Sequence, residues 1–310
     1  MAHLVLIHGL DNKPEADYLH QLWKRKLAHD DGLDVDTHGV ATAMAYWADV
    51  LYESPDTNLA AYESAAGEVE TADAAIVAPL NLHSLPDAEA QKLRRLAARL
   101  EVNPEEAETD VPTPEEVAAV KQERVPVPAW LRKRIMGRFV RDAHHYFFNL
   151  DFSPRPGVTY KVRDEMRRRF VDALKAGENN RPLVVVSHSM GTVIAYDCLM
   201  HEPDCPAVDG LMTIGSPLGL DEVQDFFPSW SRDNSFPGKV LGRWVNVFDP
   251  LDVVVGLDPR FDNDFRRNGQ FAVEDVREDN WGTWRHSISK YLQGRVLREH
   301  LARMLRAEWP

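Results

Sequence analysis

Four short apolar runs along the chain predict buried β-strands. They cover residues 4–7, 183–187, 211–214 and 245–248, and each is bounded by Gly, Pro or polar turn residues. Apolar residues follow one another in these runs with little polar alternation, which is typical of strands that are covered on both faces. A weaker run at residues 271–276 predicts a fifth strand.

Helical patterns lie between and after these runs, at residues 162–175, 193–200 and 288–305. Strands that alternate with helices favour a mostly parallel sheet with helices on both of its faces. A chain of 310 residues is long enough for one large domain of this kind that carries an insertion. We therefore expect the α/β class.

Residues 86–155 depart from this alternation. The sequence predicts an amphipathic helix at residues 85–100 and a second, aromatic-rich one at residues 129–148. Between them lies a Pro- and Glu-rich linker, residues 102–114, which ends in a helix start at Thr113 and Pro114. We predict that residues 86–155 form an inserted helical cap on a core of residues 1–85 and 156–310. The alternative is that these helices are ordinary layers over the sheet.

Charge and composition exclude several classes of partner. The formal net charge of −13 argues against a nucleic-acid binder, which needs clustered Lys and Arg. No apolar run approaches the ~18 residues of a membrane span, so we expect no integral membrane segment. The N-terminus lacks a leader pattern and there are only two cysteines, which together favour the cytoplasm. The oligomeric state stays open.

The strongest chemical signal is the segment LVVVSHSMGT at residues 183–192. A strand that ends at Ser187 and a helix that begins near Gly191 place Ser189 in the tight turn between them. Such a turn exposes a serine hydroxyl at the carboxyl edge of the sheet, beside the free amides of the helix N-terminus. The general pattern is Gly-x-Ser-x-Gly, and here Ser187 replaces the first glycine. We predict Ser189 as a nucleophile; the alternative is a plain strand-to-helix loop.

A serine nucleophile needs a base and an acid that orients the base. The segment DPLDVV, residues 249–254, follows the strand at 245–248 and offers Asp249 or Asp252 as the acid. The segment WRHSISKYL offers His286 as the base, just before the last predicted helix. Ser, Asp and His therefore occur in the order expected for a strand-borne triad.

These segments, with VLIHGL at residues 5–10 and MTIGSPLG at residues 212–219, together resemble the lipase/esterase branch of the α/β-hydrolase superfamily. The resemblance covers residues 1–60 and 180–305 and leaves out the cap. It implies an α/β-hydrolase fold and favours Asp252 over Asp249 as the acid. It also implies that the amides of Leu10 and Met190 form an oxyanion hole.

The sequence thus predicts an enzyme that hydrolyses small-molecule carboxylic esters through an acyl-enzyme. Trp130, Phe139, Phe147 and Phe148 of the cap are predicted to line the substrate pocket, which favours an apolar acyl or alcohol group. The chain has no HExxH or Cys-x-x-Cys motif, so we predict no metal and no cofactor. The alternatives are a thioesterase or acyltransferase with the same triad, a catalytically silent ligand-binding homologue, and an interaction module that uses the acidic linker.

Overall fold

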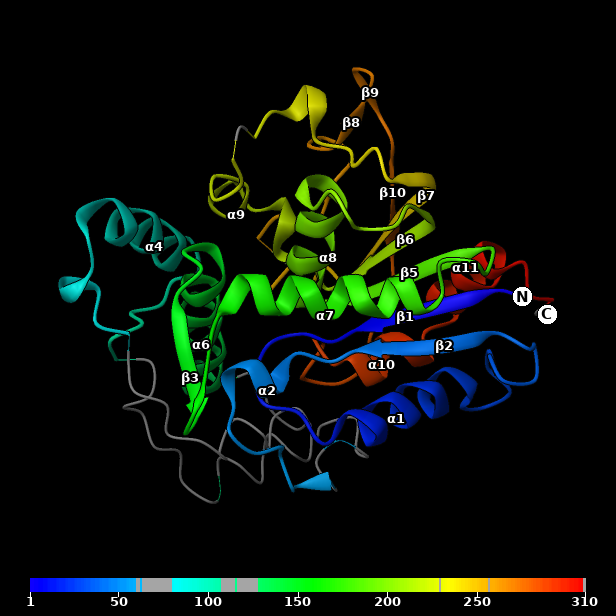
Figure 1. Cartoon of the computed structure of the whole chain (residues 1–310), viewed down its shortest axis with the longest axis horizontal. Helices are drawn as coiled ribbons and strands as arrows, with labels where there is room; N and C mark the ends of the chain where they lie inside the picture. Colours follow the sequence, from blue (N-terminus) through cyan, green and yellow to red (C-terminus); the bar gives the residue numbers. More distant parts are fainter. Residues whose placement is uncertain are drawn as a thin grey trace.

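A computed structural model describes residues 1–59, 62, 80–106, 115, 128–228, 230–255 and 257–308 (Figure 1). The predicted helix start at Thr113 and Pro114 lies outside these residues. The strands are β1 (His3–Ile7), β2 (Ala41–Ala45), β3 (Asp151–Arg155), β4 (Val158–Lys161), β5 (Leu183–His188), β6 (Val208–Ile214), β7 (Val240–Phe248), β8 (Arg266–Arg267), β9 (Gln270–Phe271) and β10 (Val273–Arg277). The α-helices are α1 (Ala16–Ala28), α2 (Ala48–Leu51), α4 (Asp87–Arg99), α6 (Ala129–Phe147), α7 (Val162–Ala176), α8 (Met190–His201), α9 (Asp221–Gln224), α10 (Ile288–Gln293) and α11 (Arg295–Leu305). Short 3-10 helices are η3 (Leu82–Ser84), η4 (Pro217–Gly219) and η5 (Arg232–Asn234).

The central sheet has six strands in the order β10-β7-β6-β5-β1-β2, and every neighbouring pair is parallel. The prediction of an α/β protein with a mostly parallel sheet is confirmed. Each of the five predicted strands is present, whereas β2 was not predicted. Its sequence, ATAMA, is Ala-rich, and it forms one edge of the sheet with mostly half-buried residues, so it lacks the continuous apolar run of a central strand.

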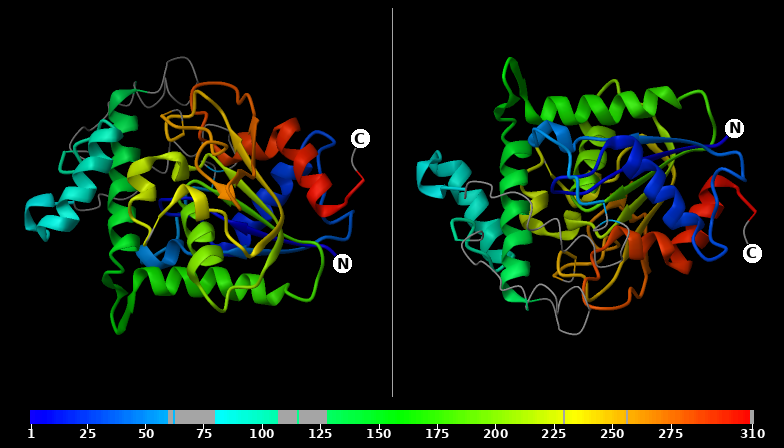
Figure 2. Two further views of the ribbon diagram at one scale, coloured as in Figure 1. Left: turned by 90° about the horizontal axis from the view of Figure 1, so that it is seen from above. Right: turned by 90° about the horizontal axis from the view of Figure 1, so that it is seen from below.

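Helices cover both faces of this sheet (Figure 2). On β1, Leu4 and Leu6 belong to a core cluster that includes residues of α1, α10 and α11. Val5 and Ile7 point to the opposite face and belong to the cluster that holds residues of α6, α7 and α8. Successive side chains of a strand face opposite ways, so a continuous apolar run supplies both layers of the core at once.

The predicted single helix at residues 288–305 is wrong, because two helices, α10 and α11, occupy this stretch. They are separated at Gly294, whose backbone is extended. The carboxylate of Glu278 lies against this glycine, and a Cβ atom at position 294 would come within 2.3 Å of it. The same carboxylate accepts a hydrogen bond from the Leu297 amide at 2.9 Å, so it satisfies the first turn of α11.

The predicted cap contains α4 and α6, which lie beyond the end of the sheet where the strands terminate (Figure 1). The predicted boundary at residue 155 falls in the turn of the antiparallel hairpin, between the paired strands β3 and β4. Of the 19 residues of α6, 14 are buried, and its apolar ones belong to the main core cluster. The apolar residues of α6 therefore pack against the main core.

Buried charges join α6 to the loop that follows β1. Arg138, which is 2% exposed, donates to Asp11 Oδ2 at 2.6 Å. Tyr52 donates to Asp11 Oδ1 at 3.2 Å and accepts a hydrogen bond from Arg141 at 2.7 Å. Burial by itself raises the pKa of Asp11, but the neighbouring cations, Arg138 foremost, outweigh burial and hold this pKa below its ordinary value. Asp11 is therefore a buried carboxylate whose charge depends on α6.

We predict that Arg138→Met lowers the free energy of unfolding by about 3 kcal/mol, because it leaves the buried Asp11 carboxylate without its main partner. Adding Asp11→Asn should recover more than half of this loss. Arg132→Met on the same helix is the control, since Arg132 pairs with Glu101 at the surface and should contribute less than about 1 kcal/mol. Urea denaturation measures all three, and similar losses for Arg138→Met and Arg132→Met would contradict the prediction.

Candidate active site

Ser189 lies in a strained turn between β5 and α8. Its backbone has φ 52° and ψ −127°, a conformation that non-glycine residues rarely adopt. Such a conformation costs on the order of 1–3 kcal/mol and persists only where the surroundings enforce it. Part of that enforcement is a hydrogen bond of 3.0 Å from the Ser189 amide to the Ile214 carbonyl at the end of β6. The side chain of Ser189 is thereby held at the carboxyl edge of the sheet.

Two glycines allow this turn to touch the loop after β1. A Cβ atom at Gly191 would lie 2.4 Å from the carbonyl oxygen of His8, and one at Gly9 would lie 2.7 Å from Ser189 Cβ. Neither position has room for a side chain. Ser187, which replaces the first glycine of the general pattern, is accommodated because its hydroxyl donates to the Met212 carbonyl on β6 at 3.0 Å.

His286 and Asp252 form a buried pair beside this turn. His286 Nδ1 lies 2.9 Å from Asp252 Oδ1 and 2.8 Å from Oδ2. Because a carboxylate can only accept, the proton is assigned to Nδ1, which leaves Nε2 with a lone pair. The Tyr291 hydroxyl donates to Asp252 Oδ2 and the Val254 amide to Oδ1, both at 2.9 Å. Asp252 is therefore fixed from three sides.

Asp249, the other candidate acid, closes the loop around this pair. Its carboxylate accepts hydrogen bonds from the amides of Leu251 and Asn280, each at 2.8 Å, and from Arg285 at 3.1 Å. Its own amide donates to the Tyr291 hydroxyl at 2.9 Å. Of the two candidate acids, it is thus Asp252 that contacts His286.

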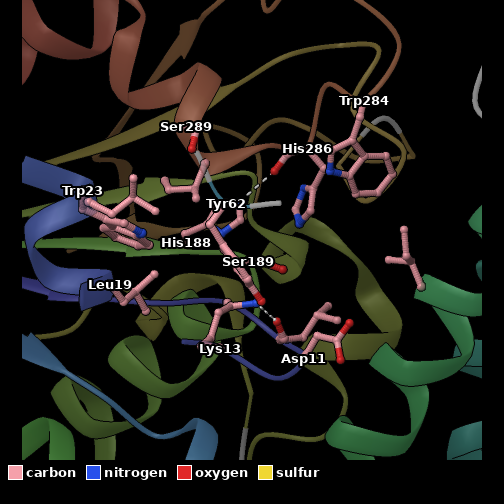
Figure 3. Close-up of a pocket in the computed structure, with 15 residues that line it drawn as sticks. Asp11, Lys13, Leu19, Trp23, Tyr62, His188, Ser189, Trp284, His286 and Ser289 are labelled. Atoms are coloured by element: carbon pink, nitrogen blue, oxygen red, sulfur yellow. Dashed lines mark hydrogen bonds between the residues drawn. The ribbon is translucent and has the colours of Figure 1, made fainter. Parts of the chain in front are cut away.

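Ser189 and His286 line one pocket at the carboxyl edge of the sheet (Figure 3). Ser189 Oγ and His286 Nε2 are both buried, and neither has a hydrogen-bond partner among the described residues. Catalytic hydrogen bonds are often long before a substrate binds. The pocket thus holds a hydroxyl and an imidazole nitrogen that are both available to a ligand.

The predicted oxyanion donors, Leu10 and Met190, come from the loop after β1 and from the start of α8. Met190 is the first residue of α8, so its amide has no acceptor within the helix. Leu10 lines the pocket, and Lys13 Nζ donates to its carbonyl at 2.6 Å. The next residue, Asp11, has φ 75° and is bonded to Arg138. The chain that follows the Leu10 amide is therefore anchored by two hydrogen bonds.

Two further histidines near Ser189 are neutral. His8 Nδ1 donates to the Gly9 carbonyl at 2.8 Å and Nε2 accepts from the Trp47 amide at 2.9 Å, and burial lowers the pKa of His8 to about 3. His188 Nε2 donates to the main-chain carbonyl of His286 at 3.1 Å. Burial, and then the nearby His286, hold the pKa of His188 well below its ordinary value. Each of these rings makes hydrogen bonds that hold the loops around Ser189.

The four aromatic residues predicted to line the pocket lie elsewhere. Phe147 stacks on Phe226 with ring centroids 4.4 Å apart, and Phe148 meets the same ring edge-on. Trp130 and Phe139 are buried in the main core cluster. The residue of α6 that does line the pocket is Ile135. An amphipathic pattern predicts that α6 buries an apolar stripe, but the packing partner of each side chain depends on tertiary structure.

Several residues of the pocket were not predicted. Leu19, Leu22 and Trp23 come from α1, and Trp284 and Ile288 flank His286. Tyr291, which bonds to the acid, also carried no signal, because its contact with Asp252 joins residues 39 positions apart. The sequence pattern of a histidine followed by a helix start does not indicate which residue of that helix contacts Asp252.

Searches of family models and of curated proteins found no match to this chain. Within the described ranges, no group of three His, Cys, Asp or Glu side chains could hold a metal ion. None of the described helices is both long and apolar enough to cross a bilayer.

We predict that Asp252→Asn lowers kcat by about 10³ to 10⁴, because an amide favours the wrong tautomer of His286. Asp249→Asn should weaken the loop and reduce thermal stability but lower kcat less than tenfold, since it does not contact the histidine. Steady-state hydrolysis of 4-nitrophenyl butyrate measures both. Equal or reversed effects would remove Asp252 as the acid.

Tyr291→Phe should lower kcat about tenfold and leave KM within about twofold, because a looser Asp252 misplaces the base and touches no substrate atom. The matched control is Tyr196→Phe, which also loses a buried hydroxyl hydrogen bond, to the Ser235 carbonyl at 2.8 Å, but at a distance from the acid. The same kinetic assay separates the two variants. A similar fall in kcat for the two variants would show that Tyr291 affects only the stability of the protein and does not position Asp252.

Proposed function

We propose that this protein is a serine carboxylic-ester hydrolase with an α/β-hydrolase fold, working through an acyl-enzyme. The main support for the proposal is that Ser189 and the pair of His286 and Asp252 meet at one pocket. Ser189 is held in a strained strand-to-helix turn, and His286 is oriented by Asp252 with its Nε2 free for a proton. The sheet supports the fold assignment, because its strand order reverses between β1 and β5, where ligands bind in open α/β sheets.

In the proposed reaction, Ser189 Oγ attacks the carbonyl carbon of the ester while His286 Nε2 accepts the hydroxyl proton. The tetrahedral intermediate collapses, the C–O bond to the alcohol breaks, and His286 returns the proton to the departing alkoxide. Water then attacks the acyl-enzyme by the same route, releasing the acid and restoring Ser189. Asp252 holds the ring and stabilises the imidazolium that forms in both steps.

The amides of Leu10 and Met190 are the proposed donors to the negatively charged oxygen of the intermediate. Removing one such donor costs about 3 kcal/mol in other serine hydrolases. The buried network of Asp11 and Arg138 supports this role, because a donor is effective only when its loop is held in place before the charge develops.

The pocket walls favour a substrate with an apolar group. Leu19, Leu22 and Trp23 of α1 line it, and so does Ile288 at the start of α10. Neutral organic ligands are held mainly by burial of apolar surface, so a small-molecule ester fits this lining. The two free, buried thiols of Cys198 and Cys205 support a reducing compartment, the cytoplasm.

The same triad could serve a thioester or transfer the acyl group to another acceptor, and these reactions remain the alternative chemistry. A silent ligand-binding homologue is disfavoured, because such a protein has no reason to keep the hydrogen bonds that orient His286.

Ser189→Ala should abolish labelling by a fluorophosphonate probe and lower ester hydrolysis by on the order of 10⁴-fold or more. Ser289→Ala is the control, since Ser289 is another serine that lines the pocket and its variant should still form the adduct. Mass spectrometry of the intact protein measures the adduct, and 4-nitrophenyl butyrate measures hydrolysis. Labelling of Ser189→Ala, or retention of more than a tenth of the activity, would rule out Ser189 as the nucleophile.

A further inference from the structure

Part of the pocket lining, which we call the lobe, is mostly apolar and includes two hydrogen-bonding side chains. We define this lobe by five of the residues that line the pocket, namely Leu19, Leu22 and Trp23 of α1 and Ile288 and Ser289 of α10. The aliphatic side chains form its walls. Trp23 and Ser289 bring an indole N–H and a hydroxyl to the same lobe, so it combines an apolar lining with two hydrogen-bonding groups.

The indole N–H of Trp23 has no acceptor in the described part of the chain. Trp23 is 2% exposed, and its Nε1 has no hydrogen-bond partner. The ring of His188 stands at 79° to the indole with centroids 6.5 Å apart, and it accepts no hydrogen bond from Trp23 Nε1. In Figure 3 the indole nitrogen lies on the side of the ring that faces His188, toward the interior of the pocket.

Buried donors in folded proteins almost always have a partner, and those that lack one call for an explanation. Leucine, valine or phenylalanine could fill the lobe without this cost. An indole that lines a ligand pocket and keeps a free donor is explained if the ligand supplies the acceptor.

We propose that this lobe binds the part of the ester that carries a neutral oxygen acceptor, namely an ether, carbonyl or hydroxyl oxygen, and that Trp23 Nε1 donates a hydrogen bond to it. The inference rests on the proposed ester hydrolase and names its substrate class as oxygen-substituted esters. A neutral oxygen is specified because the lobe contains no Lys or Arg among its described residues, and a buried carboxylate without a cation is costly. Lys13, elsewhere in the pocket, is bonded to the Leu10 carbonyl.

The arrangement predicts selectivity against purely alkyl substrates. An alkyl chain of the same length fills the lobe but leaves the indole N–H unpaired in the complex. Sites built around a hydrogen bond discriminate against analogues that lack the partner atom more strongly than apolar pockets discriminate by size. Trp23 is thus a specificity-determining residue of this site.

The test compares esters of equal length in which one methylene is replaced by an ether oxygen at successive positions of the acyl or the alcohol chain. With the wild-type protein, kcat/KM for the ester with the best-placed ether oxygen should exceed kcat/KM for the matched alkyl ester by about tenfold. Trp23→Phe removes the donor and keeps an aromatic ring, so this ratio should fall to about one whatever happens to the absolute rates. Trp284→Phe changes the indole beside His286 and should keep the ratio.

A binding experiment separates this inference from the proposed function. Matched alkyl and ether amides, which are not turned over, are titrated by calorimetry into Ser189→Ala and into Ser189→Ala/Trp23→Phe. A roughly tenfold preference for the ether amide in the first protein, lost in the second, supports the lobe even if no ester is hydrolysed, in which case only the esterase proposal fails. Hydrolysis of esters without a preference at any position, equal or absent binding of both amides, or a preference that survives Trp23→Phe overturns the inference.

Discussion

The backbone contact between the turn at Ser189 and the loop after β1 is the constraint on which the candidate site depends. β1 and β5 are neighbours in the sheet, so their carboxyl ends deliver the two loops to the same place. Gly9 and Gly191 let these loops approach until no Cβ atom fits between them. The close approach helps to hold Ser189 in a backbone conformation that would otherwise relax, and it brings Leu10 and Ser189 to one pocket. A side chain at either glycine would push the loops apart and separate all of these groups.

Buried charge secures the outer side of the same loop. Arg138 on α6 reaches Asp11 immediately after Leu10, and Arg141 is joined to the same carboxylate through Tyr52. Burying such groups is expensive, and a pair of apolar residues could provide as much stability. What an apolar pair could not provide is a defined direction for the Asp11 side chain and its peptide. The helix α6, which the sequence places in the predicted cap, thus holds the loop after β1 through Asp11.

Two aspartates of the loop after β7, Asp249 and Asp252, have different roles. Asp249 binds the amides that shape its own turn and the start of the next loop, while Asp252 binds His286. Tyr291 joins them, since its hydroxyl accepts from the Asp249 amide and donates to Asp252. A shift of the Asp249 turn would therefore move the Tyr291 hydroxyl, and with it Asp252 and His286. The position of His286 thus depends on hydrogen bonds in two loops and one helix.

Local pattern determined much of this architecture, and tertiary contact decided the rest. The buried strands and the turn at Ser189 were predictable because a continuous apolar run and a strand-turn-helix with Gly191 are properties of neighbouring residues. In the sequence, the family resemblance favours Asp252 over Asp249 as the acid. In the structure, Asp252 is the one of the two that contacts His286. Three features were missed or misplaced because each depends on a partner distant in the chain. Strand β2 pairs with the edge of β1, and the break at Gly294 depends on Glu278. Phe147 and Phe148 pack on Phe226. Sequence periodicity shows that a side chain is buried, but only the packing of separate elements decides whether it lies in the core alone, as Phe139 does, or also lines a pocket, as Trp23 does.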